Sequence, residues 1–163
     1  MTRKQNPTIQ LPRERIEQLR QFGQATSAST MSEIVGSLLK LARQQGLVEH
    51  GIPGIDVNVL ADGLAIRFPN SPTTGFSFEA ASRIADTIRE YLNGEHVGEK
   101  IEERIDIHLT DPDNHAGSFS IWRRGNSLKI GIPMNAPEMN FTHDLAAEFA
   151  DLLDRAIRQS KVA

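Results

Sequence analysis

The sequence predicts an α+β protein with a small, mainly helical N-terminal domain and a larger domain of strands and helices. Two observations predict this division. First, residues 1–48 carry seven Lys and Arg against three acids, whereas the rest of the chain carries 11 bases and 18 acids. Second, a pattern of strands and helix occurs twice after residue 56. The 163 residues are enough for two such domains.

The first element we expect is a short strand at residues 8–11, Thr8-Ile9-Gln10-Leu11, which alternates polar and apolar side chains. Pro7 and Pro12 bracket it, and the next thirty or so residues have helical patterns. Backbone N–H and C=O groups rarely stay unpaired when buried, so this strand needs a partner. The candidates are a strand of the C-terminal domain or the same strand of a second copy.

Two helices follow. The first is predicted from about Pro12 to about Gln24, because proline is favoured in a first helical turn and Ile16, Leu19 and Phe22 form an apolar stripe. The second is predicted over residues 31–45. Thr30 and Glu33 have the spacing of a capping box, and Gly46 suits the position after the helix. Its apolar face is wide and consists of Ile34, Val35, Leu38, Leu39, Leu41 and Ala42.

Residues 46–55 contain three glycines and a proline at the point where the charge balance changes. We therefore divide the chain into a domain at residues 1–46, a linker at 47–55 and a domain at 56–163.

The second domain contains an internal repeat. GLAIRFP at 63–69 resembles SLKIGIP at 127–133, and FSFEAASRIADTIREYL at 76–92 matches FTHDLAAEFADLLDRAI at 141–157. A further strand precedes each copy, at 57–61 before Asp62-Gly63 and at 118–122 before Arg124-Gly125-Asn126, as in hairpins. With an extra strand at 104–110, this predicts two β-β-α units forming one antiparallel sheet backed by two helices. Asp86 and Asp151 match in the repeat and are expected to face either solvent or each other.

Pairing of residues 8–11 between two copies would have a clear physical consequence. Ile9 and Leu11 would enter a shared core, while Asn6, Thr8 and Gln10 would point to the other side of a two-stranded ribbon. Such a ribbon fits the major groove of DNA, where Asn and Gln can read adenine and Thr can reach base edges. The alternative is that Thr8 and Gln10 form the solvated face of an ordinary edge strand.

With its strand, its helix and the Ser32-Glu33-Ile34 start of the second helix, the segment of about residues 6–46 resembles the ribbon-helix-helix fold of the Arc/MetJ class of repressors. The resemblance implies a homodimer in which Thr8, Gln10 and Asn6 contact bases. It also implies that Thr30, Met31 and Ser32 hold a DNA phosphate at the helix N-terminus, aided by Arg3, Lys4 and Arg13. The implied dimer core consists of Ile9, Leu11, Ile16, Leu19, Ile34 and Leu38. The sequence departs from the pattern at Pro12 and in having no Lys or Arg on the base-reading row.

We therefore expect a sequence-specific protein that binds double-stranded DNA as a homodimer, or as a higher oligomer on repeated elements, and acts as a transcriptional repressor. The alternatives are an accessory DNA-binding protein of plasmid transfer or partition, an antitoxin with a folded toxin-binding domain, and an assembly protein that uses the strand only to dimerise. The C-terminal domain would bind a small effector, another subunit or a protein partner.

Other function classes have little support. The chain has no cysteine, which excludes disulfides, thiolate nucleophiles and Cys-based zinc sites. Its five histidines are scattered, and the nucleophile-elbow, P-loop and dinucleotide-binding patterns are absent. We expect no enzyme activity, no cofactor and no metal. With no apolar run long enough for a bilayer and no signal peptide core, we expect a cytoplasmic protein without membrane contact. Trp122, Arg123 and Arg124 form either a nucleic-acid contact or an exposed hairpin tip.

Overall fold

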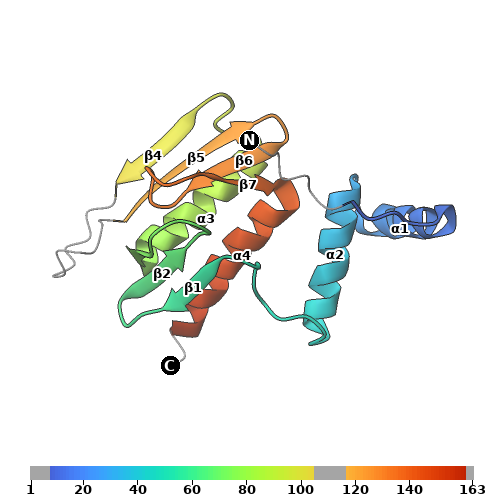
Figure 1. Cartoon of the computed structure of the whole chain (residues 1–163), viewed down its shortest axis with the longest axis horizontal. Coiled ribbons are helices and arrows are strands. Elements are labelled where there is room, and N and C mark those ends of the chain that lie inside the picture. Colours follow the sequence, from blue (N-terminus) through green and yellow to red (C-terminus); the bar gives the residue numbers. More distant parts are fainter. Residues whose placement is uncertain (1–7, 105–116, 161–163) are drawn as a thin grey trace. The chain divides into compact units, whose positions relative to one another are not determined.

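A computed structural model of the chain describes residues 8–104 and 117–160. It is an α+β structure with two antiparallel sheets (Figure 1). The chain divides into two compact units, Met1–Val48 and Glu49–Ala163. In chain order the elements of the described ranges are α1 (Arg13–Thr26), α2 (Met31–Gln44), β1 (Asp56–Val59), β2 (Gly63–Arg67), β3 (Thr74–Ser77), α3 (Phe78–Leu92), β4 (Lys100–Arg104), β5 (Ser118–Arg124), β6 (Ser127–Gly131), β7 (Met139–Thr142) and α4 (His143–Ser160).

Both predicted helices of the N-terminal unit are present. Helix α1 begins directly after Pro12, whose carbonyl accepts the N–H groups of Arg15 and Ile16. Helix α2 ends in a Schellman motif: Gly46, at φ 70°, donates to Arg43 O, and the next N–H donates to Ala42 O at 2.9 Å. The capping and termination signals in the sequence therefore mark the helix ends to within about two residues.

The predicted strand at 8–11 is not a strand in the single chain. Residues 8–12 have no regular secondary structure, and no strand of the described residues pairs with them. A β-strand is defined by hydrogen bonds to a partner strand, and the single chain does not provide them here. The described part of the N-terminal unit thus begins with helices, and the ribbon-helix-helix fold is not confirmed by it.

The predicted repeat organises the C-terminal unit, but each copy has three strands rather than two. Strands β1-β2-β3 precede α3, and β5-β6-β7 precede α4. The third strands, β3 and β7, lie where the sequence predicted a loop and a helix cap. The strands form two sheets instead of the expected one, ordered β1-β2-β3 and β4-β5-β6-β7. The extra strand β4 lies at Lys100–Arg104 rather than at 104–110; residues 105–110 are outside the described ranges.

Gly63 shows why the first repeat needs glycine at the start of β2. It pairs with Ser77 of β3, and a Cβ built on it would lie 2.0 Å from the carbonyl oxygen of Phe76. The chain turns at residues 60–62, where Leu60 N–H donates to Gly63 O at 2.8 Å. The predicted hairpin therefore exists, but the glycine serves the close approach of β3 and not the turn itself.

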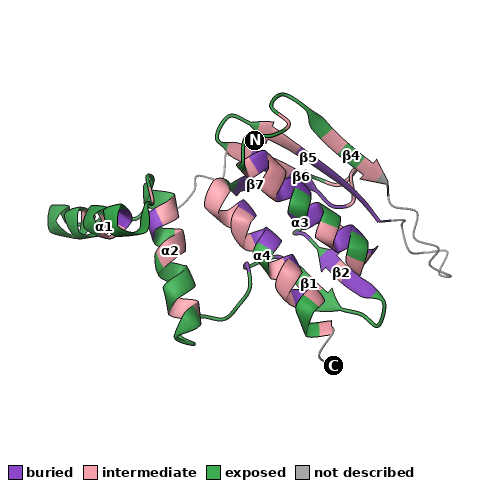
Figure 2. Cartoon of the chain, turned by 180° about the vertical axis from the view of Figure 1, so that it is seen from behind, coloured by how far each residue is buried: buried purple, intermediate pink, exposed green. Residues whose placement is uncertain are grey.

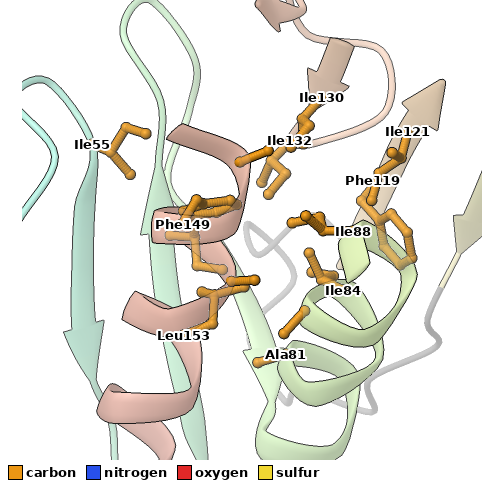
Figure 3. Close-up of a cluster of buried hydrophobic side chains, with 14 of the residues drawn as sticks. Ile55, Ala81, Ile84, Ile88, Phe119, Ile121, Ile130, Ile132, Phe149 and Leu153 are labelled. Atoms are coloured by element: carbon orange, nitrogen blue, oxygen red, sulfur yellow. The ribbon is translucent and has the colours of Figure 1, made fainter. Parts of the chain in front are cut away.

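Each helix of the C-terminal unit contacts strands of both repeats. Helix α3 contacts β2 and β3 of its own repeat and β5 of the other, whereas α4 contacts β6 and β7 of its own repeat and β1 and β2 of the other. The helices also pack against each other, and Figure 3 shows the side chains of both repeats meeting in one core. Phe68, Phe141 and Phe149 form an aromatic group within it, with ring centroids 5.4–5.8 Å apart. The C-terminal unit is therefore a single core built by both copies.

This core extends into the segment expected to be a linker. Within residues 47–55, Ile52 and Ile55 are only 5% and 6% exposed and belong to the buried cluster of the C-terminal unit. The glycines and the proline around these two isoleucines led the sequence analysis to predict a linker. In the structure the two side chains pack in the core of the C-terminal unit.

Candidate nucleic-acid interface

The start of α2 is the best-defined part of the candidate interface. Thr30 is the N-cap, and its Oγ1 accepts the N–H of Glu33 at 3.2 Å. In return, Oε2 of Glu33 accepts the N–H of Thr30 at 3.0 Å, so the predicted capping box is present. The same oxygen also accepts the N–H and the hydroxyl of Ser29, at 2.7 and 2.9 Å. These bonds fix the direction in which the chain enters α2.

The Glu33 carboxylate changes the electrostatics of this helix end. Hydrogen bonds from the Ser29 N–H and hydroxyl and from the Thr30 N–H lower the pKa of Glu33 below its usual value. The carboxylate is therefore negative at neutral pH, beside the first turn where the resemblance places a DNA phosphate. Met31 and Ser32, the first residues of α2, are both exposed there. A phosphate bound there would be attracted by the N–H groups of the first helical turn and repelled by the Glu33 carboxylate.

The residues expected to read bases are accessible where the structure describes them. Thr8 and Gln10 are exposed, and so is Arg13 at the first position of α1. Asn6, Arg3 and Lys4 lie outside the described residues. Thr8 and Gln10 are therefore both accessible to a ligand. In the single chain they do not form a site with other expected DNA-binding residues.

The residues expected to form a dimer core are largely uncovered in the single chain. Ile9 is 82% exposed, Leu11 43% and Leu38 36%, whereas Ile16 and Leu19 are half-buried. Ile34 is the one large apolar side chain buried among residues 8–48, and Figure 2 shows α1 and α2 mostly in the colour of exposed residues. Among the described residues, nine of the twelve exposed large hydrophobic side chains lie in this unit: Ile9, Leu11, Met31, Val35, Leu38, Leu39, Leu41, Leu47 and Val48.

Gly23 is a key residue that the sequence reasoning missed. A Cβ built on it would lie 2.7 Å from Cδ1 of Ile34 and 3.0 Å from the carbonyl oxygen of Ala28. The absence of a side chain at 23 therefore lets α1 and the 27–30 loop approach the one buried residue of α2. The signal in the sequence was a glycine inside a helical pattern, where alanine would ordinarily be better by about 1 kcal/mol.

The Trp122 side chain is not free to stack on a base. Its Nε1 donates to Oε1 of Glu138 at 2.8 Å, and Nζ of Lys129 lies 5.4 Å from the ring centroid. Arg123 donates through Nε to Gly125 O at 3.1 Å within the hairpin. These contacts favour a structural role for this group over nucleic-acid contact.

A pocket in the C-terminal unit has a volume of 570 Å³, which is enough for a small molecule. It lies along α3 and β4, and its charged groups are Glu79, Asp86, Glu103 and Arg83. Arg83 already contacts Glu103 at 3.3 Å and Glu90 at 3.4 Å. The ion pair of Arg83 with Glu103 therefore lies in the pocket lining, and a ligand would have to displace or complement it.

In residues 8–104 and 117–160 no group of three or more His, Asp or Glu is arranged to hold a metal ion. Over the same residues, none of the helices combines the length and apolar character needed to cross a membrane.

Comparisons of the chain with protein-family models, with curated proteins and with solved structures found no match.

Proposed function

We propose that the chain is a homodimeric, sequence-specific protein that binds double-stranded DNA and acts as a transcriptional repressor. In this proposal the N-terminal unit is a ribbon-helix-helix domain completed by a second copy. Thr8 and Gln10, with Asn6, read bases in the major groove, and the start of α2 and the basic residues near it hold phosphates.

The observation that carries the proposal is the uncovered apolar surface of the N-terminal unit. Met31, Val35, Leu38 and Ala42 follow one line along α2, at the i, i+4, i+7 spacing of a helix face, and the first three are at least 36% exposed. Two helices with a single buried large side chain cannot offset the conformational entropy of folding. Below about 70 residues a single core rarely suffices, and small domains ordinarily add disulfides, metals or oligomerisation. This chain has no cysteine. A second copy of the same surface provides the missing core.

The segment before α1 fits the same arrangement. Residues 8–11 alternate polar and apolar side chains, and Ile9 is the most exposed large hydrophobic side chain of the described residues at 82%. Pairing with the same segment of a second copy would satisfy the backbone groups and bury Ile9 and Leu11 against the α2 face. The same pairing would present Thr8 and Gln10 on the opposite side of the ribbon.

The charge distribution supports DNA as the ligand. The seven bases and three acids of residues 1–48 give this third of the chain a net positive charge, in contrast to the acidic remainder. The Glu33 carboxylate acts against phosphate binding at α2. Base contacts and the more distal Arg and Lys residues must therefore supply most of the affinity. The same contacts would serve an accessory protein of plasmid transfer or partition. The folded C-terminal core is less suited to an antitoxin, whose toxin-binding part is usually a flexible tail.

The Glu33 charge favours a second candidate, a non-DNA assembly protein. The exposed face of α2 requires a second copy whether or not DNA binds, and the Glu33 charge at the start of α2 opposes an anion there. In this candidate the strand at 8–11 serves dimerisation only.

The two candidates are distinguished by selecting bound sequences from random double-stranded DNA with the purified full chain at two salt concentrations. We expect a recovered palindrome and an affinity that falls steeply with salt. Gln10→Ala should remove the sequence preference while the protein sediments as a dimer. Gln44→Ala, an exposed glutamine at the end of α2, is the matched control and should keep the preference.

Enrichment of no sequence, together with an intact dimer, would favour the assembly protein. A monomer at all concentrations would contradict both candidates. If Gln10→Ala bound the selected palindrome as the wild type does, the assignment of the base-reading surface would be wrong.

A further inference from the structure

The connection between α3 and β4 holds a histidine between two carboxylates. Nε2 of His96 lies 3.0 Å from Oε2 of Glu90 on α3, and Nδ1 lies 3.2 Å from Oε2 of Glu99, just before β4. A neutral imidazole has one N–H and can donate to only one of these groups. With both carboxylates ionised, both contacts can be hydrogen bonds only when both ring nitrogens carry protons. The geometry therefore belongs to the protonated imidazolium.

The backbone around His96 turns sharply between α3 and β4. Helix α3 ends at Leu92, and Gly94 follows at φ 86°. The N–H of Glu95 then donates to Glu90 O at 2.9 Å. His96 follows at φ 57°, in the left-handed region that side chains other than glycine seldom adopt. A turn then closes through the N–H of Glu99, which donates to His96 O at 3.2 Å. The two carboxylate contacts are therefore made by the side chain of a residue whose backbone conformation is itself costly.

The same turn is attached to the sheet through Tyr91. This fully buried residue of α3 places its hydroxyl 2.8 Å from the carbonyl oxygens of both Glu99 and Ile121. With a single hydrogen, the hydroxyl donates to one of them at a time. The centre of the His96 ring lies 5.4 Å from that of Tyr91. The His96 imidazole thus joins Glu90 of α3 to Glu99, the residue just before β4. The Tyr91 hydroxyl lies beside this contact, within hydrogen-bonding distance of Glu99 and of Ile121 in β5.

We propose that residues 93–99 form a proton-operated latch, in which protonated His96 holds the entry of β4 against α3 and loss of the proton releases it. This inference concerns the C-terminal unit and is independent of DNA binding. The released form keeps the core of the unit and loosens the 96–99 turn and the first residues of β4.

The charges around the latch determine which end is released. Glu90 also contacts Arg83 at 3.4 Å, and Arg83 contacts Glu103 of β4 at 3.3 Å. When His96 becomes neutral, Arg83 still balances Glu90 on α3. The contact that is lost is therefore mainly the one between His96 and Glu99, whose side chain is 69% exposed. The turn that carries Glu99 is loosened as a result.

The direction of the pKa change supports action near neutral pH. Hydrogen bonds to Glu90 and then to Glu99 raise the pKa of His96 above its usual value of about 6.5. A group whose folded pKa is raised stabilises the fold fully below its unfolded pKa. That contribution is lost as the pH rises through the folded pKa. The latch is accordingly closed in mild acid and opens on the alkaline side of 6.5.

The test is an NMR titration of the full chain between about pH 5.5 and pH 9, following the His96 ring and the amide exchange of Glu99 to Ile101. We expect a ring midpoint above about 6.5. We also expect a several-fold loss of amide protection, beyond intrinsic base catalysis, at the same pH. Glu90→Gln should lower the ring midpoint and move the amide transition with it.

Two variants complete the test. His96→Gln should abolish the amide transition, whereas His50→Gln, at an exposed histidine outside the latch, should leave it unchanged. A transition that persists in His96→Gln would overturn the proposal. If that variant fails to fold, Glu90→Gln still decides, because an amide transition that does not follow the ring midpoint excludes the latch. A ring midpoint at or below about 6.5 would also overturn it.

Discussion

Arg89 and Asp154 occupy equivalent positions in the two repeats, 65 residues apart, and their side chains contact each other, with Nη2 2.5 Å from Oδ2. Asp86 and Asp151, another equivalent pair, flank the same guanidinium at 3.5 and 3.4 Å. The two aspartates therefore share a cation from one repeat, although each side chain is more than half exposed. The internal symmetry of the unit is broken at this point, since two arginines or two aspartates facing each other would repel.

This relationship predicts the outcome of a charge exchange. Arg89→Asp should destabilise the C-terminal unit because four carboxylates would then meet, and the double variant Arg89→Asp/Asp154→Arg should recover part of the loss. Both side chains are partly exposed, so we expect a coupling energy of roughly 1 kcal/mol. Denaturant unfolding followed by Trp122 fluorescence measures it. Purely additive effects of the two changes would contradict the pairing.

Gly23→Ala should destabilise the N-terminal unit, against the usual preference of helices for alanine. The added methyl group would overlap Ile34, and overpacking of this kind costs about 1–3 kcal/mol, more than the roughly 1 kcal/mol that helix propensity returns. Faster amide exchange in α2 would report the loss, with the Trp122 signal unchanged. Gly51→Ala is the control, because its added Cβ would have no neighbour within 4 Å. Unchanged exchange in Gly23→Ala would show that the contact does not limit stability.

Leu38→Glu should prevent dimerisation. It places a charge at the centre of the exposed apolar line of α2, where a second copy is proposed to pack. Sedimentation over a range of concentrations should show a dimer for the wild type and a monomer with reduced helix content for the variant. Leu60→Glu is a matched control in the C-terminal unit, since Leu60 is 45% exposed and Leu38 36%. A dimeric Leu38→Glu protein would place the subunit contact elsewhere.

Glu33→Gln should weaken the start of α2 in a pH-dependent way. The pKa of Glu33 is lowered in the folded chain, so its stabilising contribution is present above the unfolded value of 4.5 and disappears as the pH falls through the folded pKa. At neutral pH, α2 should therefore be more stable in the wild type than in the variant. In acid the stability of α2 should become the same in both proteins. Amide exchange at the first turn of α2, measured at several pH values, tests this. A constant difference down to low pH would exclude the carboxylate as its source.

The helices were predictable because their signals are local. Thr30 with Glu33 marks the start of α2, and Gly46 marks its end, each through hydrogen bonds to residues nearby in sequence. The repeat predicted α3 and α4 for the same reason. Neither prediction required knowledge of what the helices pack against.

The strands were harder to predict because their signals depend on distant partners. Strands β3 and β7 have four residues each, between a proline-containing loop and a helix, and Ser77 ends β3 while capping α3. Such short segments are recognised as strands only through pairings such as Leu64 with Phe76. The division into two sheets and the burial of Ile52 likewise depend on tertiary packing. A base-reading ribbon at 8–11 depends on a second chain, so it remains a prediction.

The core that the two repeats share has a consequence for how this unit can evolve. Duplicated segments are ordinarily free to diverge separately once each has its own core. Here the two copies share one core, because α3 and α4 pack against each other and each contacts strands of both repeats. A substitution on one copy must be matched by the other, as Asp154 matches Arg89. Among homologous sequences, positions 89 and 154 should therefore covary. The two halves of the unit are then expected to change together and not separately.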